Sequence, residues 1–207
     1  MHISDGVISL EVAATLGVAS IAMCAYSLKN LKNENIALVA SMSALFFIAS
    51  FIHIPLGPTQ IHLLLIGVIG LFLGSLSFLS ISIALLLQAI LLGYGGLSSL
   101  GANIMIMALP AYLVFLVNKL SLFKMLNEKI KFFLVGALGI AFSVVILALV
   151  LYFAKDEYLL ASYSIVIANI PAMVLEGIIT LFLLLYIKKA IPKLLKEANL
   201  WLKNFYY

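Results

Sequence analysis

The sequence is poor in charge, since Asp, Glu, Lys and Arg together make up 10% of its 207 residues. Soluble domains carry about 25% charged residues, so a soluble globular protein is excluded. Hydrophobic residues make up 65% of the chain, and the mean hydropathy is +1.25. Long apolar runs recur from end to end and leave no room for a separate soluble domain. We therefore predict an all-α, polytopic membrane protein with one integral membrane domain over residues 1–207.

Other residues and motifs that the sequence lacks exclude further kinds of site and activity. Cys24 is the single cysteine, which excludes an internal disulfide and a multi-cysteine metal site. All twelve basic residues are lysines, and in a chain this apolar they signal membrane orientation rather than nucleic-acid binding. The phosphate-binding pattern Gly-x-x-x-x-Gly-Lys-Ser/Thr does not occur, so we expect no ATPase activity and no enzyme. No basic, cleavable leader is expected before the first apolar run.

Seven apolar segments are candidates to span the membrane. A spanning helix needs about 20 mostly apolar residues, and the segments are residues 8–28, 34–53, 61–74, 76–93, 101–118, 131–154 and 163–187. The third and fourth segments are short, so we expect either to be tilted or shielded by protein. The tail, residues 188–207, alternates lysine with apolar residues, which predicts a cytoplasmic amphipathic helix or a docking surface for a partner.

The lysines predict how the chain is oriented. With the N-terminus outside and seven spans, eleven of the twelve lysines lie in the cytoplasm and only Lys155 lies outside. Lysine and arginine gather on the cytoplasmic side of membrane proteins, so we predict an N-out, C-in protein of the cell (inner) membrane. The same orientation places His2, His53 and His62, which are all of the histidines, at the outer face.

The first two residues form a potential metal chelate. The Met1 amine, the His2 amide nitrogen and His2 Nδ1 close two small rings around one ion and lie in one plane. One in-plane position stays open, and a fourth nitrogen from elsewhere in the chain would complete the tetragonal geometry that Ni(II) and Cu(II) favour. A lone terminal histidine is usually exposed and idle, however, and these two residues alone do not decide between the two interpretations.

Four stretches of the sequence resemble one transporter family. They are Met-His-Ile-Ser-Asp-Gly at residues 1–6, Ile-Pro-Leu-Gly-Pro-Thr-Gln-Ile-His-Leu at 54–63, the glycine-rich stretch 87–103, and Ile-Pro-Ala-Met-Val-Leu-Glu-Gly at 170–177. In this order they are similar to the substrate-binding membrane subunits (S components, NikM/CbiM type) of nickel and cobalt energy-coupling-factor transporters. The opening motif is the most specific of the four, because a chelate of this kind works only at residue 1.

The resemblance implies a function and a ligand set. It implies that Ni²⁺ or Co²⁺ is bound as the transported substrate, not as a cofactor, by Met1, His2 and His62. It also implies partners: a transmembrane coupling subunit, cytoplasmic ATPase subunits and a small accessory membrane subunit, all within the lipid bilayer and with no nucleic acid. The choice between Ni²⁺ and Co²⁺ stays open, although four planar nitrogens favour Ni(II) over Co(II).

Several polar residues outside the ligand set are expected to have supporting roles. Ser4 and Asp5 are expected to orient a ligand or hold the N-terminal segment near the metal, to cap the first helix, or to do both. Asn103, beside the glycine-rich loop, is expected to support the ligands, and Gln88 is expected to be hydrogen-bonded, because an unpaired amide is costly in a membrane. His53 has no counterpart in the family motif. Glu176 is expected to lie well below the ligands and to couple helices or subunits.

The rival function is a membrane redox protein that holds haem or another metal centre. Haem held by two histidines needs them to face each other from different helices, but His53 and His62 flank one proline loop and His2 is terminal. A diiron centre needs several Glu and His residues at helical spacing, and Glu176 has no such partner. The pattern also shows neither the acidic ring of a channel nor the paired constellation of an intramembrane protease.

Overall fold

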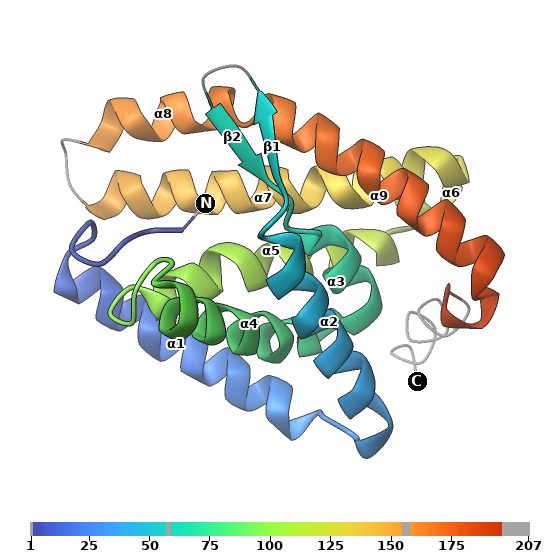
Figure 1. Cartoon of the computed structure of the whole chain (residues 1–207), viewed down its shortest axis with the longest axis horizontal. Coiled ribbons are helices and arrows are strands. Elements are labelled where there is room, and N and C mark those ends of the chain that lie inside the picture. The colour runs from blue at the N-terminus through green and yellow to red at the C-terminus, as the bar shows by residue number, and fades with distance from the viewer. Residues whose placement is uncertain (1, 57–58, 155–157, 196–207) are drawn as a thin grey trace.

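Helices make up most of the described chain, together with one short β-hairpin (Figure 1). The structure, a computed structural model, describes residues 2–56, 59–154 and 158–195. In chain order its elements are α1 (Leu10–Lys29), the 3₁₀ turn η1 (Asn33–Asn35), α2 (Ile36–Ala49), β1 (His53–Leu56), β2 (Thr59–His62), α3 (Ile66–Leu73), the 3₁₀ turn η2 (Gly74–Leu76), α4 (Ser77–Leu92), α5 (Leu100–Lys119), α6 (Ser121–Met125), α7 (Glu128–Ala154), α8 (Leu159–Ala168) and α9 (Ile170–Ala190). The predicted all-α, multi-pass membrane architecture is confirmed.

Five helical segments of the described residues are long and apolar enough to cross a membrane. Four of them, α1, α5, α7 and α9, correspond to predicted spans. The fifth runs through α3, η2 and α4 as one apolar stretch, Ile66–Leu92, where the sequence suggested two separate spans. The segment Asn33–Ala49 is apolar but shorter. The count of seven spans and the N-out orientation therefore stay predictions.

Helix α3 forms the centre of the molecule. All eight of its residues are buried, and it packs against α5 and α7. A Cβ atom on Gly67 would come within 1.8 Å of the Val135 carbonyl oxygen, and one on Gly70 within 2.0 Å of the Ala111 carbonyl oxygen. Glycine at these two positions lets three helices touch backbone to backbone. An apolar helix without a polar face is stable only when protein or lipid surrounds it, and the expected shielding by protein is confirmed.

The predicted span 163–187 is not continuous. The chain is helical from Leu159 to Ala168, turns at Asn169 and starts a new helix at Ile170. Pro171 lies in the first turn of α9, where its missing N–H costs no hydrogen bond. Within a continuous helix the same proline would remove a hydrogen bond and clash with the preceding turn, so the sequence ends α8 here.

The first helix begins later than the capping interpretation of Ser4 and Asp5 requires. Helix α1 starts at Leu10, and the Ser9 hydroxyl oxygen accepts a hydrogen bond from the Val12 N–H at 3.4 Å. Serine is a favoured N-cap because its side chain satisfies one of the unpaired amides of the first turn. The proposal that Ser4 or Asp5 caps this helix is therefore wrong, and residues 2–8 are free to run elsewhere.

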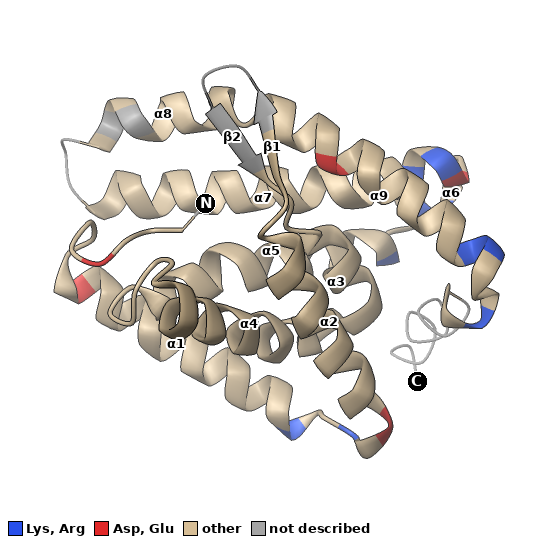
Figure 2. Cartoon of the chain, in the orientation of Figure 1, with Lys and Arg blue, Asp and Glu red and all other residues tan. Residues whose placement is uncertain are grey.

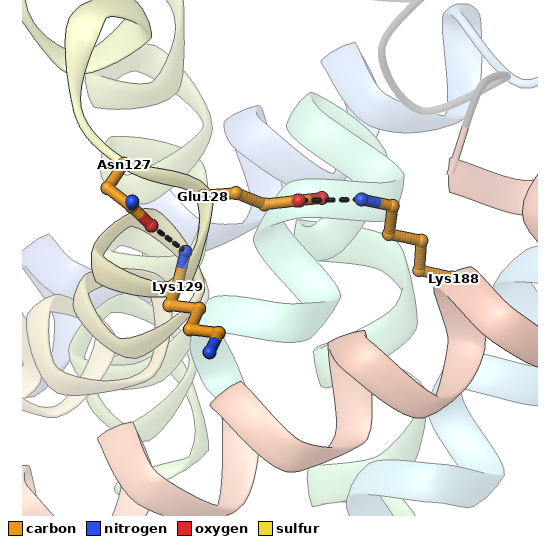
Figure 3. Close-up of polar contacts among 4 residues, drawn as sticks. All are labelled: Asn127, Glu128, Lys129 and Lys188. Atoms are coloured by element: carbon orange, nitrogen blue, oxygen red, sulfur yellow. Dashed lines mark hydrogen bonds and ion pairs between the residues drawn. The ribbon is translucent and has the colours of Figure 1, made fainter.

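The described lysines gather at one end of the molecule. Figure 2 shows them near the C-terminal end of α1, around α6 and at the C-terminal end of α9. At this end the Lys188 ammonium pairs with the Glu128 carboxylate at 2.6 Å, and the Asn127 side-chain oxygen accepts from the Lys129 N–H at 3.0 Å (Figure 3). The pair joins the start of α7 to the end of α9. Of the predicted amphipathic tail, residues 196–207 lie outside the described part of the chain.

Candidate metal centre

Asn103 holds the backbone of the N-terminal segment. Its side-chain oxygen accepts from the Ile3 N–H at 2.8 Å, and its amide nitrogen donates to the Ile3 carbonyl at 2.9 Å. The Ser99 hydroxyl donates to the same carbonyl at 2.8 Å. Asn103 and Ser99 lie at the start of α5 and are almost fully buried. Asn103 thus pairs with Ile3 as a neighbouring strand would, which fixes the residue next to His2.

Asp5 fastens the segment at a second point. Its N–H donates to the Gly95 carbonyl at 3.0 Å, and its carboxylate accepts from the Ser98 hydroxyl at 2.6 Å and from the Ser99 N–H at 3.0 Å. The hydrogen bond from Ser98 is the main reason why the pKa of Asp5 is lowered. A Cβ atom on Gly96 would lie 2.2 Å from this carboxylate. Only glycine at this position, with its φ of +122°, allows the loop to receive Asp5.

Two of the three predicted supporting residues fasten the N-terminal segment to the loop or to α5, and the described contact of the third lies within the segment, so their role at a metal stays a prediction. Asn103 and Asp5 each make several of the contacts described above. Exposed Ser4 contributes, among the described residues, its backbone carbonyl, which accepts from the Val7 N–H at 3.4 Å. Met1 itself lies outside the described residues.

His2 is tied to α4 through a chain of hydrogen bonds. His2 Nε2 lies 2.9 Å from Gln88 Oε1, Gln88 Nε2 donates to Ser50 Oγ at 2.8 Å, and Ser50 Oγ donates to the Phe47 carbonyl at 2.6 Å. The Ser50 contact uses the amide nitrogen of Gln88, so its oxygen faces the histidine as an acceptor. The proton of a neutral His2 ring is consequently on Nε2, and Nδ1 has a free lone pair.

The β-hairpin brings the other two histidines together. Strands β1 and β2 pair antiparallel with His53 opposite His62, and the two ring centroids are 4.2 Å apart. His53 Nδ1 contacts the Phe51 carbonyl oxygen at 2.8 Å. The sequence indicated only a proline loop here, because a hairpin of four-residue strands has too short an alternating pattern to recognise. Rings this close on one hairpin leave no room for a haem between them.

The surroundings keep His2 and His62 neutral. Burial lowers the pKa of His2 to about 4, with smaller contributions from the positive amino terminus and from His62. Burial also lowers the pKa of His62, followed by the charges of the amino terminus and of His53, while a hydrogen bond to the Ser50 backbone acts in the opposite direction. A metal ligand must be deprotonated, so both imidazoles are ready to bind a cation at neutral pH.

Among the described residues no group of three or more His, Cys, Asp or Glu side chains is placed to hold a metal ion. His2 and His62 are thus not part of a larger cluster of such side chains within the described part of the chain.

Sequence reasoning missed Ser50 and named no partner for Gln88. Both residues are polar, fully buried and located at the ends of apolar helices. A polar residue in such a place indicates that it has a partner, but it does not indicate which one.

The chain is similar in sequence and in fold to proteins named for metal transport. A relative from Haemophilus influenzae, whose name places it in metal transport, is 31% identical over 96% of this chain and 98% of its own. The fused nickel transport protein NikMN of Rhodobacter capsulatus is 33% identical over 55% of this chain and 35% of its own length. The crystal structure of a transition metal transporter superposes with a TM-score of 0.77, at 25% identity, over all of this chain and 98% of that one.

The family model described as the cobalt uptake substrate-specific transmembrane region (CbiM) matches residues 2–194, which is nearly the whole sequence. The match includes His2, the hairpin with His62, the glycine-rich loop and the last long helix. The chain belongs to the CbiM family.

Proposed function

We propose that this chain binds Ni²⁺ or Co²⁺ with high affinity at the outer membrane face and takes it up as the substrate-specific subunit of an ATP-driven energy-coupling-factor transporter. The observation that carries the proposal is the fixed N-terminal segment, in which His2 presents Nδ1 while Ile3 and Asp5 are fastened to α5 and the glycine-rich loop. Membership of the cobalt uptake family and the similarity to a nickel transport protein support the choice of metals.

The proposed ligands are four nitrogens: the Met1 amine, the His2 amide, His2 Nδ1 and one ring nitrogen of His62. The terminal residue and His2 close two adjacent chelate rings, and His62 occupies the remaining position in the plane. Such a set contains no charged side chain, and the deprotonated amide supplies negative charge. Ligands of this kind in a plane suit Ni(II) and exclude the hard cations Mg²⁺ and Ca²⁺, which bind oxygen.

Gln88 and Ser50 serve this ligand set by selecting the tautomer of His2. A metal-bound histidine ordinarily donates its other ring N–H to an acceptor, which fixes the orientation of the ring and raises the basicity of the bound nitrogen. Gln88 Oε1 is that acceptor, and Ser50 keeps the amide of Gln88 from turning over.

Replacing Gln88 with leucine is expected to weaken Ni(II) binding about 10- to 100-fold, the usual loss when a residue that supports a metal ligand is removed. The proton of His2 then has no fixed acceptor, and Nδ1 competes with Nε2 for it. Calorimetric titration of the purified protein in detergent measures the loss. Gln88→Glu keeps an acceptor and should retain more affinity than Gln88→Leu. Ser82→Ala, on the same helix but away from His2, should bind as the wild type does.

The distribution of lysines supports the proposed orientation of the chain, with the metal centre at the outer face. The described lysines gather at one end of the helices, and the N-terminal segment lies toward the other (Figure 2). Positive charge marks the cytoplasmic end, so the metal centre faces outward and the lysine-rich end faces the proposed ATPase and coupling subunits.

Uptake in cells tests this function. Cells that lack this gene are compared with cells that regain it, and accumulated nickel and cobalt are read by elemental analysis. The proposal expects uptake to return only when the ATPase subunits of the same transporter are present and active. Full uptake with inactive ATPase subunits would contradict ATP-driven coupling, and no uptake of either metal in the complete system would contradict the proposed substrate.

A further inference from the structure

Glu176 is a buried carboxylate in the last long helix that the ligand set does not use. It is the seventh residue of α9, and 1% of its surface is exposed. Among the described residues it is the only acidic side chain in the buried core. A carboxylate inside a membrane protein is costly unless it is paired or hydrogen-bonded, so its partners indicate what it does.

Its partners are two backbone N–H groups that closely follow His62 in the chain. Glu176 Oε1 accepts from the Leu64 N–H and, at 3.1 Å, from the Leu65 N–H, and Oε2 lies 3.3 Å from the same Leu65 nitrogen. These two residues follow His62 directly after Leu63 and join β2 to α3. The sequence placed Glu176 well below the ligands, and this expectation is wrong, because the carboxylate reaches the turn that carries His62.

The turn needs such an anchor. Leu65 has a φ of +53° and is, among the described residues, the one non-glycine residue with a positive φ. A leucine adopts this left-handed conformation only when its surroundings hold it there. One residue after His62, the Leu63 N–H donates to the Ile52 carbonyl at 3.2 Å. The peptide after His62 is therefore fixed from α9 by Glu176 and from the segment between α2 and β1 by Ile52.

We propose that Glu176 is a positioning residue for the metal ligand His62. Its carboxylate holds the β2–α3 turn in the conformation that positions the His62 imidazole for the metal, and it joins α9 to the end of the β-hairpin. This inference rests on the proposed function, because it requires His62 to be a ligand. A residue that only satisfied the amides of α3 would contribute to folding and leave the ligand shell of the metal unchanged.

The test replaces Glu176 with methionine, which has a similar volume and no acceptor, and measures Ni(II) affinity and the visible absorption of the complex. We expect affinity to fall about 10- to 100-fold, as for other residues that support a ligand. The absorption band should move to longer wavelength, because water is a weaker-field ligand than the displaced imidazole. Glu176→Gln keeps the oxygen that accepts from both amides and should bind nearly as well as the wild type.

Two further variants make the result decisive. Thr180→Val, one turn along the same helix and equally buried, is the matched control and should leave affinity and spectrum unchanged. Glu176→Asp keeps the charge, but its side chain is too short to reach the turn, so this variant should also lose affinity. It tests the proposal even if the methionine variant does not fold. In a His62→Ala background, Glu176→Met should cause no further loss, since Glu176 acts through His62.

The outcomes separate this inference from the proposed function. Unchanged binding in His62→Ala would overturn the proposed ligand set. Weakened binding in His62→Ala, with wild-type affinity and spectrum in Glu176→Met and Glu176→Asp, would overturn only the positioning role. A further, independent loss of affinity in the double variant would overturn it as well.

Discussion

Replacing His62 with alanine is expected to remove tight Ni(II) and Co(II) binding while the protein still folds and enters the membrane. The side chain lies on a hairpin at the edge of the helical core rather than within it. Its loss leaves three nitrogens and one open in-plane position. We expect affinity to fall by more than about 100-fold, beyond the loss typical of residues that only support a ligand. Calorimetric titration in detergent measures the change.

His53→Ala is the matched control on the same hairpin. Its ring lies opposite His62 and contacts the Phe51 carbonyl, but it has no place in the proposed ligand set. The variant should lose far less affinity than His62→Ala. Equal affinities of His62→Ala and the wild type would contradict the assignment of His62, and an equal loss in both variants would mean that the hairpin, rather than one ring, matters.

A single glycine added before Met1, and not cleaved, is expected to abolish high-affinity binding. The extension converts the amine of Met1 into an amide and moves the free amine one residue away from His2, so the two chelate rings no longer form. Methionine removal needs a small second residue, and histidine is large, so we expect the natural Met1 to be retained. Uptake of Ni²⁺ or Co²⁺ and calorimetry of the purified protein both report the loss.

The same addition at the C-terminus is the control and should leave binding unchanged, because it leaves the amine free. Wild-type affinity in a protein whose N-terminal extension is confirmed by mass spectrometry would show that the terminal amine is not a ligand. The N-terminal segment would then serve to place His2 alone through the contacts of Ile3 and Asp5.

The candidate ligands can be predicted from the sequence, but few of the contacts that hold them in place can. His2 and His62 follow from motifs whose chemistry is local, because a terminal chelate and a histidine after a proline loop are visible as strings of letters. Asn103 and Asp5 are predicted from the sequence to support the site, and they contact Ile3 and the glycine-rich loop, while their role at a metal stays a prediction. Asn103 is recognisable because a buried amide needs a partner, whereas Asp5 is exposed and is indicated only by its place in the opening motif.

The remaining features depend on contacts between distant segments. The chain from His2 through Gln88 to Ser50 joins three segments, and Glu176 contacts residues that lie more than one hundred positions earlier. No local sequence pattern indicates which two buried polar groups form a hydrogen bond with each other. The separate helix α8 was missed for a different reason: hydropathy is continuous through Asn169 and Pro171, so the apolar run concealed the break that proline causes.

The ligand shell of the bound metal tests the proposed centre most directly. X-ray absorption at the nickel edge of the untagged, Ni(II)-loaded protein is expected to show a four-coordinate planar shell of nitrogens, with scattering from two imidazole rings. The same measurement on His62→Ala should show one imidazole ring fewer. A six-coordinate shell rich in oxygen, or a shell in which His62→Ala changes nothing, would contradict the centre built from Met1, His2 and His62.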